Sequence, residues 1–147
     1  MSGPENDPGA ILIFAAGFGT RMGALTATRP KPLIPVAGHA LLDHALDIAR
    51  DVPRKVVNAH YLADQIVAHL AERPEIAVSV EQPDILDTGG GLRRAAPLLG
   101  NETCFTLNSD AVWTGPNPLK SLAAAWDGAR MDALLLLVPK RRATAHA

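Results

Sequence analysis

The stretch "AILIFAAGFGTRMG", residues 10–23, joins an unbroken apolar run to a series of closely spaced glycines. A short apolar run that ends at glycine is typical of a strand buried on both faces of a parallel sheet. The pattern therefore predicts a strand over residues 10–17. The segment that follows, residues 17–38, is rich in glycine and proline and is predicted to be a loop.

Outward from this stretch, apolar runs alternate with segments of helical periodicity. Strands are predicted at residues 54–60, 75–82, 103–110 and 131–139, and helices at residues 40–50, 62–73, 88–100 and 119–129, with Pro97 interrupting the third helix. Such alternation predicts a three-layer α/β sandwich with a mainly parallel sheet. We expect one domain over residues 10–147 and a flexible polar tail at residues 1–9.

The composition excludes several classes of partner. Lys and Arg number 14 against 15 Asp and Glu, so no basic excess favours nucleic acid or an anionic membrane. The longest apolar run, residues 133–139, is far shorter than the ~20 residues that span a bilayer, and the start "MSGPENDPGA" lacks a signal-peptide pattern. The lone Cys104 fits a reducing compartment. We expect a cytoplasmic protein.

Polar segments follow several of the predicted strands at their carboxyl ends. The glycine loop follows the first strand, "EQPDILDTGGG" (residues 81–91) the third, and "NSDAVW" (residues 108–113) the fourth. Ligands of open parallel sheets bind at this edge. The segments are therefore expected to converge on one site.

The glycine loop admits more than one interpretation. Gly17 and Gly19 fit the start of a dinucleotide fingerprint, but Met22 stands where its third glycine belongs, and no P-loop pattern is present. What remains is a glycine turn that carries Thr20 and Arg21. Bare backbone N–H groups and a guanidinium can hold a triphosphate. The alternative is an ordinary tight turn with an exposed arginine.

Two charged residues stand at positions that restrict them. Lys31 lies between Pro30 and Pro32, which fix the backbone and hold the ammonium with little freedom. Asp110 ends an apolar strand, where a carboxylate is rare without a partner. The alternatives are a solvated lysine in a rigid loop and an aspartate that caps a turn or helix.

Together, "AAGFGTRMGALT" (residues 15–26) and "RPKPLIPVAG" (residues 29–38) resemble the signature of the sugar-phosphate nucleotidyltransferases. Phe14 replaces the usual Leu and Ala24 the usual Pro. The later segments "VVNAHYLADQI", "DTGGGLRRAAPLLG" and "NSDAVW" are similar to those of N-acetylmuramate-1-phosphate uridylyltransferases, which act in cell-wall recycling. The resemblance implies a Rossmann-like fold of the nucleotide-diphospho-sugar transferase type.

The resemblance also implies a reaction and a set of catalytic residues. A sugar 1-phosphate, here N-acetylmuramate 1-phosphate, attacks the α-phosphorus of a nucleoside triphosphate, here UTP, and pyrophosphate leaves. Arg21 and Lys31 would neutralise charge, and Asp110 would hold Mg²⁺. Apart from the resemblance, the position of Asn108 near Asp110 would let it orient the sugar or the acid, and Trp113, three residues after the acid, could line the sugar pocket.

Base choice is expected in the segment of residues 81–91. The Gln82 carboxamide can donate and accept at once, which suits the imide edge of uracil, although a strand-end glutamine facing water is the alternative. Asp87 is expected to cap the following helix, and Asn58 and His60 end the second strand, where they could face the sugar. The full set of expected nucleotide-binding residues is Ala15, Ala16, Gly17, Gly19, Thr20, Arg21, Gln82, Gly89 and Gly90.

The resemblance further implies that something is missing at the C-terminus. Relatives continue past the position where this sequence ends, and their second metal-binding Asp has no counterpart here. The chain is thus expected to be C-terminally truncated, with an incomplete sugar-binding part. Alternatives are a transferase for another pair, such as GTP and mannose 1-phosphate, and a nucleotide-binding module without turnover.

Overall fold

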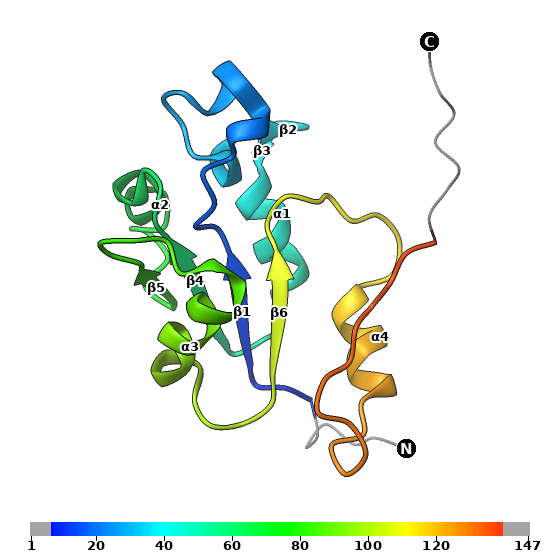
Figure 1. The fold of residues 1–147 in the computed structure, drawn as a ribbon. Coiled ribbons are helices and arrows are strands. Elements are labelled where there is room, and N and C mark those ends of the chain that lie inside the picture. Colours follow the sequence, from blue (N-terminus) through cyan, green and yellow to red (C-terminus); the bar gives the residue numbers. More distant parts are fainter. Residues whose placement is uncertain (1–6, 140–147) are drawn as a thin grey trace.

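The computed structural model describes residues 7–139, and its centre is a four-stranded sheet in the order β5-β4-β1-β6 (Figure 1). The strands are β1 (Ala10–Phe14), β4 (Arg54–Ala59), β5 (Ile76–Val80) and β6 (Cys104–Asn108). Every pairing is parallel, and β1 lies between β4 and β6 with Leu12 opposite Val56 and Thr106. The predicted parallel sheet is confirmed over these strands.

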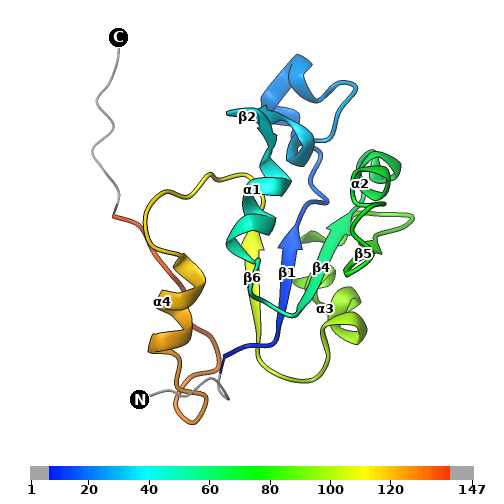
Figure 2. The same ribbon diagram turned by 180° about the vertical axis from the view of Figure 1, so that it is seen from behind.

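Helices cover both faces of the sheet and form the outer layers, as the two opposite views show (Figures 1 and 2). They are α1 (Leu41–Ile48), α2 (Ala63–His69), α3 (Asp87–Leu99) and α4 (Pro118–Ala125). Alternate residues of β1 point to opposite faces of the sheet, as a strand requires. Ile11 and Ile13 therefore join one apolar cluster, and Ala10 and Leu12 join another. The predicted three-layer sandwich is confirmed.

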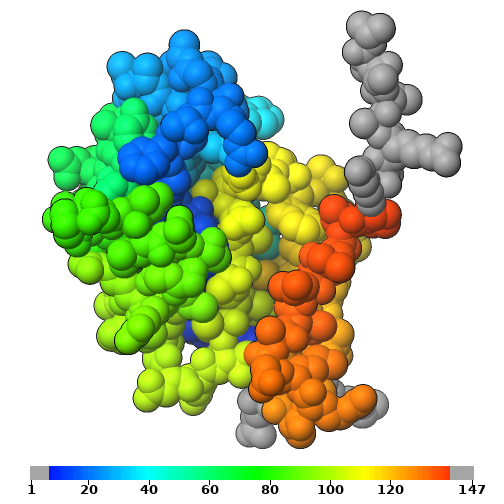
Figure 3. Space-filling model, in the orientation of Figure 1, coloured from blue at the N-terminus to red at the C-terminus, as the bar shows by residue number. Residues whose placement is uncertain are grey.

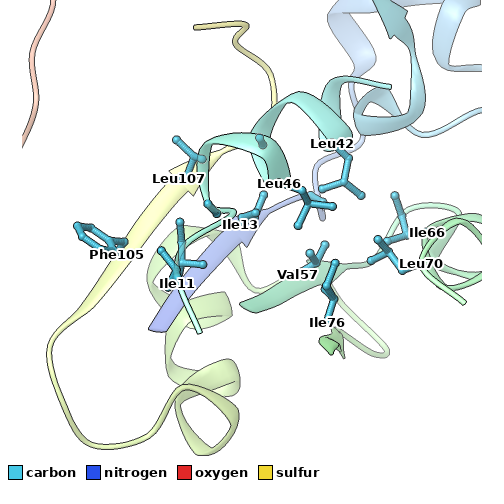
Figure 4. Packing of buried hydrophobic residues seen from close by; sticks show 14 of the residues in the cluster. Ile11, Ile13, Leu42, Leu46, Val57, Ile66, Leu70, Ile76, Phe105 and Leu107 are labelled. Carbon is cyan, nitrogen blue, oxygen red and sulfur yellow. The ribbon is translucent and has the colours of Figure 1, made fainter. Parts of the chain in front are cut away.

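The larger apolar cluster joins the sheet to α1 and α2 (Figure 4), and through Leu119 it also includes α4. Leu42 and Leu46 of α1 lie over β1 and β4, and Ile66 of α2 extends the cluster toward β5. On the opposite face, Ala95 and Leu99 of α3 pack on Leu12 and its neighbours. Burial on both faces makes β1 the strand that fixes the position of the loop after it.

The predicted loop of residues 17–38 contains short regular elements. Two 3₁₀ turns, η2 (Thr20–Thr26) and η3 (Lys31–Leu33), precede the two-stranded antiparallel pair β2 (Pro35–Val36) and β3 (His39–Ala40). A ring nitrogen of His44 in α1 lies 2.8 Å from the Val36 carbonyl oxygen. This contact links the segment of residues 17–38 to the helix that follows it.

The predicted strand at residues 131–139 is wrong: within the described residues this segment forms no strand. It runs extended beside α4 (Figure 1), and a hollow of ≈ 290 Å³ separates Leu134, Leu135 and Leu136 from β6. Among the described residues, the backbone of this segment pairs with neither β6 nor another strand. Leu135 and Leu137 are 76% and 79% exposed, so the apolar composition that predicted a buried strand reflects no burial here.

Helix α3 also differs from expectation, because Pro97 does not interrupt it. The proline lies in the last turn, where its missing N–H costs one bond and its exposed side chain meets solvent. The helix closes normally, with the Gly100 amide donating to the Ala96 carbonyl at 3.0 Å.

No helix in the described part of the chain is both long enough and apolar enough to cross a membrane. The expected tail at residues 1–9 lies mostly outside the described residues, as do residues 140–147 of the expected domain.

Candidate functional site

A cavity of ≈ 500 Å³ opens at the carboxyl ends of the sheet strands. Its walls come from residues 14–22, from Lys31 and Pro32, from the ends of β4 and β5, from residues 85, 87 and 88 and from residues 108–110. Figure 3 shows the hollow between the blue, green and yellow segments of the chain. The volume is in the range of small-ligand sites. The polar segments that follow the first, third and fourth predicted strands therefore meet at one place.

Most of the sequence-predicted site residues line this cavity, but four do not. Those that line it are Ala15, Ala16, Gly17, Gly19, Thr20, Arg21, Lys31, Asn108 and Asp110. Gln82, Gly89, Gly90 and Trp113 lie outside its lining. Gln82 is exposed, and Trp113 lines a neighbouring hollow described below.

Lys31 and Asp110 meet directly in the cavity. The lysine Nζ donates to Asp110 Oδ2 at 2.9 Å, although the two residues lie 79 positions apart in the sequence. Their side chains are 29% and 48% exposed, so solvent screens the pair and its contribution to stability is small. The consequence is chemical instead: an ammonium and a carboxylate stand side by side where a ligand would enter. Arg21 lines the same cavity and is exposed.

The glycine loop folds tightly over Lys31. Gly19 has φ +64°, and a Cβ at this residue would lie 2.9 Å from Thr26 Cγ2 and 3.0 Å from Lys31 Cβ. Only glycine combines this backbone conformation with this close approach. The Thr26 hydroxyl donates to the carbonyl oxygens of Gly19 and Gly23, at 3.0 and 3.2 Å. The Tyr61 hydroxyl in turn donates to the Thr26 carbonyl at 2.7 Å, which braces the loop from the side of β4.

Side chains from the neighbouring strands also hold the end of β1. The Ser109 hydroxyl donates to the Phe14 carbonyl at 2.6 Å, and the Ala15 amide donates to Asn58 Oδ1 at 2.7 Å. The Ser109 hydroxyl therefore braces the end of β1 from the side of β6. The Ala15 N–H is already bonded, so Ala15 can offer a ligand only its carbonyl group.

Sequence reasoning missed Glu81, which lines the cavity and is 1% exposed. The available signal was an acid directly after the apolar strand "IAVSV", the same signal that singled out Asp110. Asn58 also lines the cavity, but it is 2% exposed and its amide is bonded within the protein. Asp87 lines the cavity as well, and α3 has no side-chain cap, so the expected capping role of Asp87 is wrong.

A second hollow of ≈ 290 Å³ adjoins the first and shares Asn108 and Asp110 with it. Trp113 lines this hollow. The Trp113 Nε1 atom is buried and has no hydrogen-bond partner among the described residues. A buried donor without a partner is costly unless a ligand or water accepts from it. The adjoining hollow is thus lined by a tryptophan whose indole N–H has no acceptor among the described residues.

The cavity could hold a divalent cation only if water and substrate phosphates supplied most of its ligands. Residues 7–139 contain no group of three or more acidic, His or Cys side chains that could enclose a metal. Mg²⁺ does not need such a cage, since it keeps several waters and takes one or two carboxylates together with substrate phosphates. The half-exposed Asp110 carboxylate meets that requirement. The Cys104 thiol, whose pKa is raised by burial, lies outside this cavity.

Comparison with known proteins gives a consistent result. The MobA-like NTP transferase domain family matches residues 11–145. The chain is 45% identical over 140 residues to the N-acetylmuramate alpha-1-phosphate uridylyltransferase of Caulobacter vibrioides, covering 88% of this chain and 58% of that protein. It is 37% identical over 107 residues to the protein of the same name from Neisseria meningitidis, covering 69% of this chain and 46% of that protein.

Among solved structures, a nucleotidyl transferase from Methanothermobacter thermautotroptrophicus superposes with a TM-score of 0.68 at 21% identity, covering 81% of this chain and 58% of that chain. This likeness shows the fold. The chain spans about half the length of the curated relatives named above. The sheet, the cavity at its carboxyl edge and the match over residues 11–145 agree: the chain belongs to the family of MobA-like NTP transferase domains.

Proposed function

We propose that this chain carries the nucleotide-binding part of a sugar-1-phosphate nucleotidyltransferase, with UTP and N-acetylmuramate 1-phosphate as substrates, in cell-wall recycling. One observation carries the proposal: the glycine loop, Arg21, Lys31 and Asp110 line one cavity. The names of the relatives from Caulobacter vibrioides and Neisseria meningitidis support the choice of base and sugar. A substrate of this kind implies the cytoplasm, where nucleoside triphosphates are made.

The proposed reaction is a substitution at phosphorus. An anionic phosphate oxygen of the sugar 1-phosphate forms a bond to the α-phosphorus of UTP. The bond from that phosphorus to the bridging oxygen breaks, and the electron pair leaves with pyrophosphate. The nucleophile is already charged, so the reaction needs no general base. Catalysis then consists of positioning and of neutralising the negative charge.

The cavity supplies the cations for that task. Arg21 would grip two phosphate oxygens with its planar guanidinium, and Lys31 would act as a compact charge. Lys31 would exchange its contact with Asp110 for a phosphate oxygen. Asp110 would then be free to hold Mg²⁺, which when bound supplies charge neutralisation on the phosphates.

The remaining contacts divide between base and sugar. The segment of residues 15–17 would contact the base with its backbone. Gln82 stays our proposal for the uracil edge, and its exposed carboxamide would have to turn inward from its position after Glu81. Gly89 and Gly90 would leave room near the ribose. Asn108 and the unpaired Trp113 Nε1 would bind the sugar in the adjoining hollow.

Pyrophosphate release in the presence of Mg²⁺ tests the proposal, with each of the common nucleoside triphosphates paired with a panel of sugar 1-phosphates. Release confined to UTP with N-acetylmuramate 1-phosphate would support the full proposal. Release with another pair, such as GTP and mannose 1-phosphate, would keep the reaction and change the substrates. Nucleotide binding without release from a folded chain would favour a binding module and overturn turnover.

A further inference from the structure

A buried chain of hydrogen bonds connects two walls of the cavity through Asn58 and Glu81. The Ala15 amide donates to Asn58 Oδ1 at 2.7 Å, and Asn58 Nδ2 donates to Glu81 Oε1 at 2.8 Å. The other carboxylate oxygen, Glu81 Oε2, accepts from the Leu86 amide at 2.8 Å. Asn58 and Glu81 are 2% and 1% exposed, so water does not compete for these bonds. We call this chain the Asn58–Glu81 relay.

The relay has a direction that its two ends impose. Each end is a backbone N–H, which can only donate. An amide side chain accepts on one side and donates on the other, whereas a carboxylate accepts on both sides. Two amides in series would leave two donors facing each other at one link. One amide and one carboxylate give each link one donor and one acceptor, and Asn58 and Glu81 are that combination.

Helix α3 packs its backbone directly against the relay at Gly91. A Cβ at Gly91 would lie 2.6 Å from Glu81 Oε1 and 2.8 Å from Asn58 Nδ2. Gly89, two residues earlier, would meet nothing within 4 Å. The Glu81 amide also donates to the Ala59 carbonyl at 2.8 Å, which holds the strand ends of β4 and β5 together. The relay thus joins the ends of β1, β4 and β5 to the start of α3.

A carboxyl group buried in this way is an expensive means of gaining stability alone, because its hydrogen bonds must first offset the cost of removing it from water. Both members of the relay line the cavity, and each end belongs to a segment that forms a wall. Ala15 lies in the wall that begins at Phe14. Leu86 lies between Ile85 and Asp87, which line the opposite wall.

We infer that Glu81 is a positioning residue for the nucleotide: through Asn58 and Leu86 it fixes the spacing of the two walls between which the base and ribose would lie. The inference rests on the proposed function and deepens it. Glu81 need not touch the ligand, since its effect is carried by the backbone that it holds.

The test compares Glu81→Gln, Asn58→Asp and the double variant Asn58→Asp/Glu81→Gln, with Glu75→Gln as a matched surface control at the other end of β5. In Glu81→Gln, the NH₂ group of the new side chain must face another donor, either Asn58 Nδ2 or the Leu86 amide. The double variant restores an acceptor toward Ala15, a donor between the two side chains and an acceptor toward Leu86. Titration calorimetry with UTP and Mg²⁺ gives Kd, thermal melting reports folding, and pyrophosphate release gives kcat at saturating UTP.

We expect Glu81→Gln to weaken UTP binding about ten- to a hundred-fold, the range for losing a hydrogen bond to a charged group. The double variant should recover Kd to within about three-fold of the parent, a difference below 1 kcal/mol. At saturating UTP, kcat should change much less than Kd. Glu75→Gln should bind as the parent does.

Several results would overturn the inference. A Glu81→Gln chain that melts at a lower temperature but binds UTP like the parent would make the relay merely structural. A double variant that folds but stays weak in binding would refute the directional argument, as would a double variant that fails to fold. If Glu81→Gln itself does not fold, the double variant decides by the same criteria. A parent that binds no nucleoside triphosphate would overturn the proposed function and this role with it, an outcome distinct from the others.

Discussion

The contrast between Gly91 and Gly89 in helix α3 allows a stability prediction. Replacing Gly91 by alanine should lower the free energy of unfolding, whereas the same substitution at Gly89 should raise it. A methyl group on Gly91 would lie 2.6 Å from Glu81 Oε1, whereas ordinary contacts begin at 3.4 Å. The difference, 3.4 − 2.6 = 0.8 Å, must be taken up by the carboxylate or by the helix. A shift of that size can stretch the 2.8 Å bond from Asn58 beyond hydrogen-bonding range.

The magnitude follows from three contributions. Overpacking a buried site costs about 1–3 kcal/mol, and leaving a buried polar group unpaired costs about 1–3 kcal/mol. Alanine returns about 0.5–1 kcal/mol of helix propensity. Gly91→Ala should therefore destabilise the fold by about 1–5 kcal/mol, and the middle of that range, about 3 kcal/mol, lowers the melting temperature by about 10 °C. Gly89→Ala, in open space, should gain about 0.5 kcal/mol from the same propensity.

Urea unfolding followed by circular dichroism measures both values, and equal slopes for parent and variants verify that unfolding remains comparable. If Gly91→Ala were as stable as the parent, the close packing of α3 against the relay would be refuted. If Gly89→Ala lost as much stability as Gly91→Ala, the effect would belong to the helix and not to the relay.

Three further predictions concern the cavity. Lys31→Ala should lower kcat by about 10²–10³, as expected for a lost electrostatic contact to a developing charge, with UTP–Mg²⁺ affinity and melting temperature as the control readouts. Asp110→Asn should raise the Mg²⁺ concentration needed for half-maximal pyrophosphate release, with little change in melting temperature because the Lys31–Asp110 pair is solvent-screened; an unchanged Mg²⁺ requirement would remove Asp110 from the metal site. Trp113→Phe, which deletes the Nε1 donor, should raise KM for the sugar phosphate about ten-fold and leave KM for UTP alone, and steady-state kinetics with each substrate varied would reveal the opposite pattern if Trp113 served the nucleotide.

Most of the sheet was predictable because strands that are buried on both faces consist of continuous runs of apolar residues. The runs that became β1, β4, β5 and β6 were identified within a few residues of their observed ends. The run at residues 131–139 has the same composition, yet composition does not specify a hydrogen-bonding partner. Its backbone lies across a hollow from β6 in the described chain, so the same pattern produced no strand.

The residues of the candidate site were harder to predict from the sequence than the strands. Gln82 was singled out because a carboxamide suits a base. Its neighbour Glu81 was overlooked, although neighbouring residues at a strand end point to opposite sides and only one of them can face Asn58. The parallel pairing of β4 with β5 places Asn58 opposite Ser79 and directs the Glu81 side chain toward Asn58. Which of two adjacent residues at the end of a strand points into the cavity could not be determined from the chemistry of their side chains alone. The meeting of Lys31 with Asp110 was easier to foresee, since both follow strands that end at the same edge.

The bonds that hold the end of β1 have a consequence for the entropy of binding. Phe14 and Ala15 are held by Ser109 and Asn58 before any ligand arrives, so their ordering is already complete in the folded protein. A ligand that meets these atoms loses no affinity to freezing them, which is the usual cost at a binding loop. Beyond these anchors, Thr26 and Tyr61 brace the backbone of η2, whereas the side chains of Thr20 and Arg21 are exposed. The first residues of the loop thus supply a fixed reference frame, and the entropy lost on contact with a phosphate ligand comes from exposed side chains such as Arg21.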